Sequence, residues 1–389
     1  MGTADIGGGR VAELRKARGL TQVALARRAG VSLSLLSKIE LGDRALTPSV
    51  AAGIARALRI SLGAFYGEVE VAEDQSVLLA ALRTAVRRYD IPDQAPVPDP
   101  AQLRVDLDRA IALRAQADLA GLLRMLPGLL TRATTYAHAV ASPRGWALLA
   151  DVYSVAYYLA ARNRWMDLVE IAPTRQAWAS SQQPNPLLTA VAARDRADTF
   201  LHCGDFDGGL TVVDRAIVVA ETELTGPERA FATGILHVRG MELAGRLSDR
   251  AEAQRHIQAA WTAAEEFPHD LQRHNQIFGP ANTTSHVLVT QGDLGRPREV
   301  THLAEQLAGN DTRLPPTRLQ SVHTSTARAQ LDLGDREGAQ SSLIKSFTVA
   351  PQKAKVHPMS LDVLRVLISL HRRSNPQLVQ LARQAGLTG

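Results

Sequence analysis

The sequence contains a single cysteine, Cys203, among 389 residues, and no uninterrupted run of 18 or more apolar residues. One cysteine excludes a disulfide framework and any cysteine-rich zinc or iron–sulfur site. The missing apolar run excludes an ordinary membrane-spanning helix. The first ten residues also lack the apolar core of a secretory signal. The sequence therefore predicts a protein of the reducing cytoplasm, without a membrane partner.

Motifs for several kinds of chemistry are missing as well. No GxxxxGK[ST] phosphate loop and no HExxH pair occurs, and GGGR at 7–10 is interpreted as a flexible lead rather than a dinucleotide fingerprint. His269 and His274 lie five residues apart and are interpreted as surface residues rather than a metal pair. Cys203, beside His202 at the end of an expected helix, is interpreted as a packed thiol rather than a nucleophile. We therefore expect no enzyme, no cofactor and no metal.

The excess positive charge is concentrated near the N-terminus. The whole chain has 44 Lys and Arg against 39 Asp and Glu, a formal net charge of +5. Residues 1–70 hold ten of the basic and six of the acidic residues, a net charge of +4. A polyanionic partner is therefore expected to bind the first fifth of the chain rather than the remainder.

Helical patterns dominate, and we predict an all-α fold. Long Ala-, Leu-, Arg- and Glu-containing stretches are separated by short Gly, Pro and Asp/Asn turns, and the only strand-like fragment is 69–71. Residues 90–100 (DIPDQAPVPDP) contain four prolines and cannot continue a helix. This break predicts three parts: an N-terminal domain at 1–70, a connecting helix and Pro-rich linker at 71–100, and a helical domain at 101–389.

Residues 10–66 divide into about five short helices with recognisable ends. Thr21 and Ser32 can cap the second and third helices, and Gly30 and Gly42 can end them in the left-handed conformation. Thr47-Pro48 opens the fourth helix, because proline is tolerated in a first turn. Apolar residues recur at helical spacing and predict a small core, formed by Leu25, Ala26, Val31, Leu36, Ile39, Ile54 and Leu58.

This segment, TQVALARRAGVSLSLLSKIELGDRALTPSVAAGIARAL, resembles the XRE family, the DNA-binding domains of phage-type repressors. The match comprises Thr21-Gln22, Leu25-Ala26, Gly30-Val31-Ser32, Ser37-Lys38-Ile39-Glu40, Gly42 and Pro48. The resemblance implies a five-helix repressor-like helix-turn-helix domain. Its third helix would lie in the major groove of operator DNA and read base edges with its exposed N-terminal face.

Residue by residue, the resemblance implies two kinds of DNA contact. Gln22 would brace the start of the second helix against a phosphate, and Arg10 and Arg44 match positions that contact phosphate. The base-reading positions fall on Leu33, Ser34 and Lys38, with Ser32 and Ser37 nearby. Leu33 departs from the family's usual polar residue, so it could only touch a thymine methyl or pack on sugar.

Some of these residues have a simpler interpretation. Ser32 could serve only as a helix cap, and Lys38 could be a solvated charge. Glu40 is expected to pair with arginines of the second helix rather than to contact DNA.

A repeat begins at about residue 101. The turns Gly204-Asp205, Ser248-Asp249, Gly292-Asp293 and Gly334-Asp335 are spaced by 44, 44 and 42 residues, and Asn163 lies 41 residues before Gly204. A fixed period of helix–turn–helix units predicts an α-solenoid. The units resemble tetratricopeptide repeats, although they exceed that family's usual length of ~34 residues. The resemblance implies a superhelix whose first helices line a concave surface.

Residues ten, six and two positions before each turn share one face of the first helix, and the tetratricopeptide register exposes that face to the groove. Of the fifteen residues, thirteen can form hydrogen bonds. The sequence therefore predicts an effector-binding stripe, the alternative being an ordinary solvated face. The stripe comprises Tyr153, Tyr157, Ala161, Arg194, Asp198, His202, Val238, Glu242, Arg246, Asn282, His286, Thr290, Thr324, Arg328 and Asp332.

Asn275 is a further candidate, together with Asn282 of the stripe, because amides along repeat helices can clamp a peptide backbone. The alternative, which we favour, is that the break at Gly279-Pro280 leaves these residues in a loop.

These features together predict a bacterial transcription regulator that binds operator DNA as a homodimer. Its repeat domain would mediate dimerisation and sense a peptide or small-molecule effector. The layout resembles XRE regulators with repeat bodies from actinobacteria and peptide-pheromone-sensing regulators of Gram-positive bacteria. The alternative is a DNA-tethered interaction module whose groove binds a protein partner.

Overall fold

The structure, a computed structural model, describes residues 8–67, 73–309, 313–370 and 375–387, so the fragment 69–71 lies outside the described residues. The regular secondary structure of the described residues is helical apart from one short hairpin, which confirms the predicted all-α fold. None of the described helices is long and apolar enough to cross a membrane. The first seven helices are α1 (Gly8–Ala17), α2 (Gln22–Ala29), α3 (Leu33–Leu41), α4 (Pro48–Leu58), α5 (Leu62–Tyr66), α6 (Glu73–Arg87) and α7 (Pro100–Gln116).

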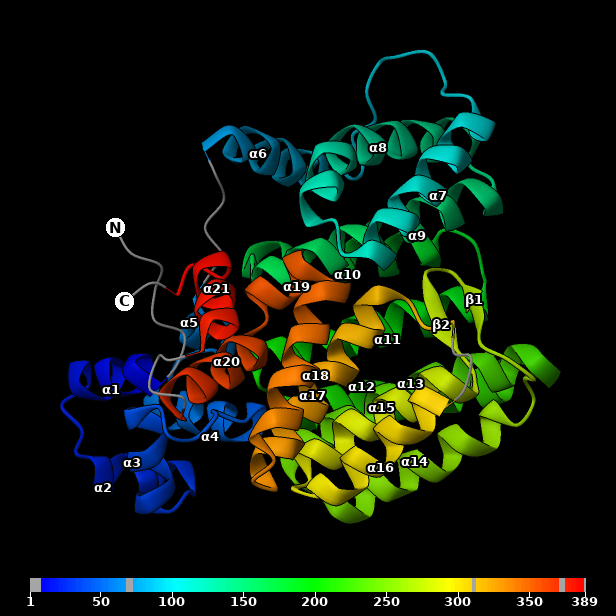
Figure 1. The fold of residues 1–389 in the computed structure, drawn as a ribbon. Coiled ribbons are helices and arrows are strands. Elements are labelled where there is room, and N and C mark those ends of the chain that lie inside the picture. The colour runs from blue at the N-terminus through cyan, green and yellow to red at the C-terminus, as the bar shows by residue number, and fades with distance from the viewer. Residues whose placement is uncertain (1–7, 68–72, 310–312, 371–374, 388–389) are drawn as a thin grey trace. The chain divides into compact units, whose positions relative to one another are not determined.

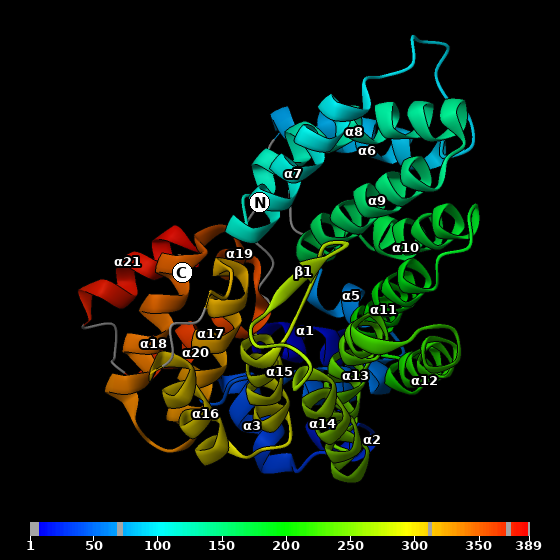
Figure 2. The ribbon, with the colours of Figure 1, turned by 90° about the vertical axis from the view of Figure 1, so that its right-hand side faces the viewer.

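The remaining elements are the helix pairs and the hairpin (Figures 1 and 2). They are α8 (Leu119–Val140), α9 (Pro143–Asn163), α10 (Met166–Ser181), α11 (Pro186–Cys203), α12 (Phe206–Glu223), α13 (Gly226–Leu247), α14 (Arg250–Ala264), β1 (Leu271–Arg273), β2 (Gln276–Phe278), α15 (Pro280–Asp293), α16 (Pro297–Gly309), α17 (Pro316–Asp332), α18 (Arg336–Val349), α19 (Pro351–Val356), α20 (Pro358–Leu370) and α21 (Pro376–Gln384).

The chain divides into two compact units. Unit 1 comprises 1–67, 244–251 and 284–389, and unit 2 comprises 68–243 and 252–283. The predicted functional division at residues 70 and 100 stays a prediction.

The N-terminal helices α1 to α5 lie close to their predicted positions. A Ser or Thr comes directly before each of α2 to α5, and its hydroxyl accepts a hydrogen bond from the backbone N–H three residues later. Gly30 and Gly42 end α2 and α3 with φ of 69° and 80°, the left-handed region that glycine adopts most readily. The side chains of Leu25, Leu36 and Ile54 are fully buried and join α2, α3 and α4 in one core.

Antiparallel helix pairs follow, which confirms the predicted repeats. α9 packs on α10, α11 on α12 and α17 on α18 (Figure 1). A left-handed residue follows the first helix of each pair: Arg164, Gly204, Ser248, Gly295 and Gly334.

Two of the predicted turn positions were wrong. Gly292-Asp293 belongs to the last turn of α15, and the left-handed residue is Gly295. In the same way Asn163 ends α9, and the left-handed residue is Arg164. The residues ten, six and two positions before Arg164 are Ser154, Tyr158 and Arg162. These three, instead of Tyr153, Tyr157 and Ala161, are equivalent to Arg194, Asp198 and His202 of the next repeat.

The hairpin of β1 and β2 in unit 2 is an element that the sequence analysis missed, because three-residue strands are too short to show alternation. Leu271 pairs with Phe278 across the hairpin. The fully buried ring of Phe278 meets Phe231 and Phe267 edge to face, with centroids 6.1 and 5.7 Å apart. Gly234 of α13 lies directly against this ring, and a Cβ there would collide with it. The hairpin is therefore held by aromatic packing.

Two buried histidines join α13 and α14 within unit 2. The Nδ1 atoms of His237 and His256 lie 2.9 Å apart, and Nη2 of Arg255 lies 3.1 Å from Nε2 of His256. A carboxylate oxygen of Glu252 lies 3.4 Å from the same Nε2 atom. Burial lowers the pKa of His237 to about 3 and that of His256 to about 4, so the pair is neutral at pH 7.

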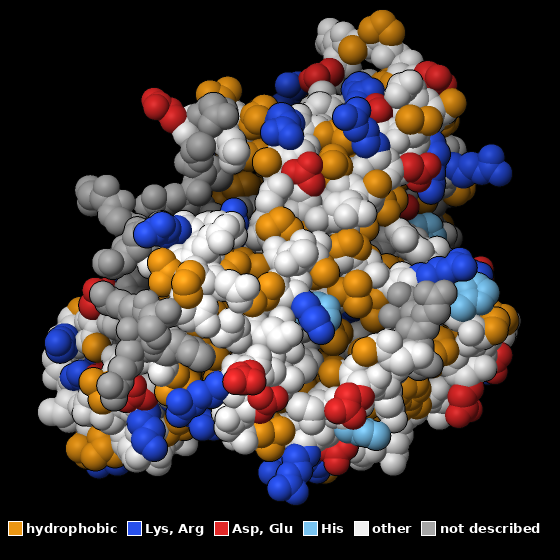
Figure 3. All heavy atoms as spheres, viewed as in Figure 1, with side chains coloured by type: hydrophobic (Ala, Val, Ile, Leu, Met, Phe, Trp, Pro, Cys, Tyr) orange, Lys and Arg blue, Asp and Glu red, His pale blue; other side chains and the backbone are white. Residues whose placement is uncertain are grey.

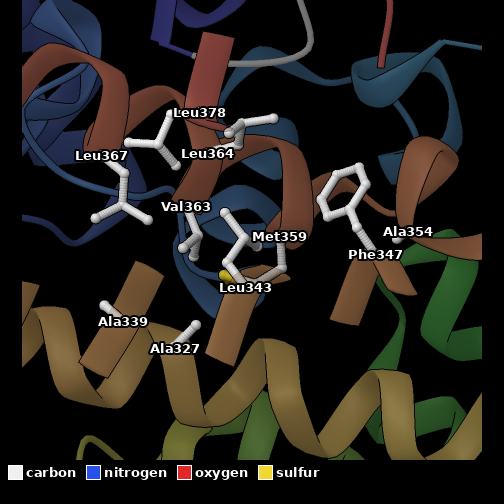
Figure 4. Close-up of a cluster of buried hydrophobic side chains, with 10 residues drawn as sticks. All are labelled: Ala327, Ala339, Leu343, Phe347, Ala354, Met359, Val363, Leu364, Leu367 and Leu378. Atoms are coloured by element: carbon white, nitrogen blue, oxygen red, sulfur yellow. The ribbon is translucent and has the colours of Figure 1, made fainter. Parts of the chain in front are cut away.

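The C-terminal part of unit 1 has its own apolar core, built from α17 to α21 (Figure 4). Figure 4 shows Leu364, Leu367 and Leu378 grouped together at one end of this core. Its buried members are Ala327, Ala339, Leu343, Phe347, Ala354, Met359, Val363, Leu364, Leu367 and Leu378.

We expect Leu364→Ala to destabilise the protein by about 2–5 kcal/mol, because Leu364 is fully buried and its truncation leaves a cavity. Leu370→Ala is the matched control on the same helix, since Leu370 is 37% exposed, and should cost less than about 1 kcal/mol. Urea unfolding followed by circular dichroism measures both variants. Equal losses would contradict the assignment of this core.

Acid should destabilise the protein through the histidine pair. Both pKa values lie below the ordinary 6.5 in the folded state, so the unfolded chain binds more protons below about pH 6.5. Stability is then lost as the pH falls from about 6.5 towards about 4, by up to about 1.4 kcal/mol per pH unit for each histidine.

The melting temperature measured between pH 7.5 and 5 tests this expectation. The double variant His237→Asn/His256→Gln should lose stability less steeply with acid than the wild type. His302→Gln, which replaces an exposed histidine, should keep the wild-type slope. A double variant with the wild-type slope would show that the pair does not govern the acid response.

Candidate DNA-binding surface and buried polar cluster

Leu33 and Ser34 of the predicted base-reading residues lie in the exposed first turn of α3, and Lys38 lies in its last turn. Leu33 is 45% exposed, Ser34 and Lys38 are exposed, and Ser37 is half-buried. The hydroxyl of Ser32 accepts the backbone N–H three residues later at 3.1 Å, so Ser32 does cap the helix. The cap uses only an acceptor site of the hydroxyl, which leaves its proton able to donate.

A buried carboxylate fixes the position of α3. Glu40 accepts two hydrogen bonds from Arg15 of α1, at 2.7 and 2.8 Å, and one from the amide of Gln22 of α2 at 2.8 Å. Burial raises the pKa of Glu40, but the bonds from Arg15 and Gln22 outweigh it and the pKa is lowered. The expectation that Glu40 pairs with arginines of the second helix was wrong, because its ion pair is with Arg15 of the first.

The residues expected to contact phosphate have protein partners of their own. Gln22 binds Glu40, Arg10 lies 3.7 Å from Glu13, and Arg44 lies 2.9 Å from Asp332 of α17 in unit 1. A phosphate would therefore compete with the Arg44–Asp332 ion pair. On the face drawn in Figure 3, basic side chains are interspersed with acidic and apolar ones rather than gathered in one patch. The phosphate contacts stay predictions.

The predicted effector stripe is buried rather than solvated. Asp332 is exposed, His202, Arg246 and Arg328 are half-buried, and the other predicted effector residues are buried. The alternative of an ordinary solvated face is therefore wrong for the buried members, whose side chains little water reaches. The buried members are Tyr153, Tyr157, Arg194, Asp198, Glu242, Asn275, Asn282, His286 and Thr324.

Within unit 2, ion pairs between α11 and α13 form the centre of this interior. Nη1 of Arg239 lies 2.9 Å from Asp198 and also contacts Glu242. Arg194 lies 2.7 Å from Asp195 and 3.8 Å from Asp198. Burial raises the pKa of Asp198, but Arg239 and Arg194 outweigh it and lower the pKa to about 2. The carboxylate is therefore ionised at neutral pH. We call these five residues, with the groups bound to them, the buried polar cluster.

Arg239 was missed by the sequence analysis, since it does not fall ten, six or two residues before a turn. Its spacing of three residues from Glu242 places both on one side of α13, and this spacing was the available signal. Asp195 was missed in the same way, beside Arg194.

The hairpin attaches to this cluster. Asp195 accepts hydrogen bonds from Ser154 at 2.7 Å and from Gln276 at 3.1 Å. The amide of Asn275 donates to the backbone oxygen of Asp151 at 2.7 Å. Asn275 thus lies in the turn between β1 and β2, as the loop interpretation predicts. The hairpin covers polar groups of both α9 and α11.

Asn282 instead lies in α15. Its amide donates to the backbone oxygen of Ile277 at 2.7 Å, which attaches the start of α15 to β2. The helical position differs from the loop that we favoured.

In unit 1 the stripe residues belong to two separate sets. Asp293 lies 2.9 Å from Arg246 and 3.7 Å from Arg328, which forms one set of charges. Thr324 belongs to another, made of neutral groups, where it contacts Gln320 at 2.9 Å and Ser346 at 2.8 Å. The stripe therefore does not form a single row of equivalent side chains.

Three side chains in the described part of unit 2 have the spacing of metal ligands. Single ligand atoms of Asp214, Glu252 and His256 lie within 4.8 Å of one another. Nη2 of Arg255 lies 2.8 Å from Asp214, 2.5 Å from Glu252 and 3.1 Å from His256. The guanidinium already supplies the positive charge at this position.

The comparisons with known proteins bear on the N-terminal helices. Residues 11–65 match the helix-turn-helix family model, but no curated protein matches the chain. The crystal structure of Bacillus thuringiensis PlcR in complex with the peptide PapR7 and DNA is 19% identical, covers 66% of this chain and 94% of its own, and has a TM-score of 0.32. The APC/C hetero-tetramer Cut9-Hcn1 is 12% identical, covers 97% of this chain and 73% of its own, and has a TM-score of 0.36.

The matched residues coincide with α1 to α5, including the Ser- and Thr-capped helices and the exposed start of α3. The helices after them pack as successive antiparallel pairs. Residues 11–65 therefore form a helix-turn-helix domain, and tetratricopeptide-like helix pairs follow it along the chain.

Proposed function

We propose that the chain is a cytoplasmic, sequence-specific transcription regulator that binds its operator as a homodimer and responds to a peptide or small-molecule effector. The observation that supports sequence-specific binding is the exposed start of α3 on a helix held from below by the Glu40–Arg15 pair. A rigid helix with exposed polar residues at its N-terminal end suits the major groove.

The proposed DNA contacts are of two kinds, contacts with bases and contacts with phosphates. Lys38 would donate to guanine O6 or N7, Ser34 would bond a base edge, and Leu33 would pack on a thymine methyl. Arg10 would contact phosphate, which positions the domain without reading sequence. In a homodimer, two such helices would read half-sites about 34 Å apart, one turn of DNA.

The repeat body suits ligand binding better than catalysis. In the buried polar cluster, Nε of Arg239 is buried and lacks a hydrogen-bond partner, and a bound ligand would supply one. The single cysteine is a poor nucleophile, because burial raises the pKa of Cys203. For such a ligand to control DNA binding, it must bind two arrangements of the protein with unequal affinity.

We expect Lys38→Ala to weaken operator binding about 5- to 150-fold, the equivalent of 1–3 kcal/mol, and to change binding to scrambled DNA much less. Arg10→Ala should weaken binding to both DNAs and reduce the salt slope by about one. Lys16→Ala, at an exposed lysine of α1, is the matched control. Fluorescence anisotropy on an operator selected from random duplexes measures all three. Equal losses for Lys38→Ala on operator and scrambled DNA would refute base reading by Lys38.

Native mass spectrometry of the protein purified from its own host should show a dimer that carries extra mass. The added mass gives the size of the effector and decides between a peptide and a metabolite. A dimer without added mass would favour the alternative function, in which the groove binds a protein partner. A monomer without added mass would contradict the dimeric half-site arrangement.

A further inference from the structure

Two arginines of unit 2 lie against one tyrosine ring. The guanidinium carbons of Arg114 from α7 and Arg162 from α9 lie 5.0 and 5.2 Å from the ring centroid of Tyr158. Tyr158 is 8% exposed, whereas both arginines are half-buried. Tyr158 and Arg162 lie six and two residues before the left-handed Arg164, so they occupy the groove positions of the first repeat.

Neither arginine has a carboxylate partner among the described residues. Asp195 is bound by Ser154, Gln276 and Arg194, while Arg239 binds both Asp198 and Glu242. Nη1 of Arg114 and Nε of Arg162 are buried and have no hydrogen-bond partner. The surroundings thus hold four arginines (Arg114, Arg162, Arg194 and Arg239) against three carboxylates (Asp195, Asp198 and Glu242).

Arg114 and Arg162 therefore carry positive charge that no ion pair among the described residues balances, at a partly desolvated position. Burial lowers the pKa of Arg114, which expresses the cost of holding its charge there. The tyrosine face attracts the guanidinium groups and orients them, but it accepts none of their hydrogen bonds. An oxyanion would supply both the missing charge and the missing acceptors, because the planar guanidinium matches carboxylate and phosphate in a two-bond geometry.

We propose that Arg114 and Arg162, oriented by Tyr158, bind a carboxylate or phosphate group of the effector. This inference rests on the proposed function only in assigning the anion to the effector, because anion binding itself requires no DNA. An effector held here joins α7 to α9 through one charged group. Its affinity then depends on the spacing between these two helices.

Isothermal titration calorimetry of the full-length protein with inorganic phosphate, and separately with succinate, tests the site. Sodium chloride keeps the ionic strength constant, so that general screening is the same in each titration. We expect saturable binding of one anion per chain for at least one of the two probes. Phosphate alone would assign a phosphate group to the effector, and succinate alone would assign a carboxylate.

The double variant Arg114→Gln/Arg162→Gln should bind the anion at least tenfold more weakly. Arg109→Gln, at an exposed arginine of α7, is the matched control and should bind as the wild type does. Circular dichroism checks that the double variant keeps its helices. If it does not fold, the single variants Arg114→Gln and Arg162→Gln replace it, each with an expected loss of at least threefold.

The absence of saturable binding to the wild type, or unchanged binding in the variants, would overturn the site. Operator binding measured on the same preparations separates this outcome from a failure of the proposed function. Wild-type protein that binds operator but neither anion contradicts the anion site alone. Protein that binds an anion but no duplex DNA contradicts the regulator.

Discussion

Arg239 of α13 binds Asp198 of α11 and Glu242 of its own helix where little water reaches, so these ion pairs join the two helices. A buried carboxylate without a partner is costly, and removal of one partner leaves the other uncompensated. The helix pairs can bury their apolar faces only against neighbouring pairs, which brings their polar faces together as well. The buried polar cluster is the consequence, because every charge enclosed by this packing needs a partner.

The same rule underlies the anion site that we propose at Arg114 and Arg162. Asp195 has three donors, from Ser154, Arg194 and Gln276, and is satisfied by the protein. Arg114 and Arg162 have the face of Tyr158 but no acceptor for the buried N–H groups. An interior that pairs these carboxylates and leaves these arginine donors open would select for anions at the proposed site. This selectivity comes from the difference in pairing rather than from net charge, which is small over the repeat body.

The helix-turn-helix domain uses a buried ion pair for a different purpose. Glu40 receives Arg15 from α1 and Gln22 from α2, so three helices are joined at one carboxylate below the exposed start of α3. The helix that we propose reads bases, α3, is thereby oriented by groups that are not among the proposed base-reading residues. Direct base recognition needs such rigidity, because hydrogen bonds to base edges tolerate little displacement.

The sequence by itself determined the N-terminal helices and their ends. Thr21, Ser32 and Gly42 act within one or two turns of their own position, so local pattern was enough to place α2 and α3 and to identify the helix-turn-helix. The tertiary structure decided which polar residues meet. The pairing of Arg239 with Asp198 joins residues 41 positions apart, and the contact of Asn275 with Asp151 joins residues 124 apart. The short hairpin that covers α9 and α11 depends on Phe278 packing against distant aromatic rings, and a three-residue strand carries no local signal of that contact.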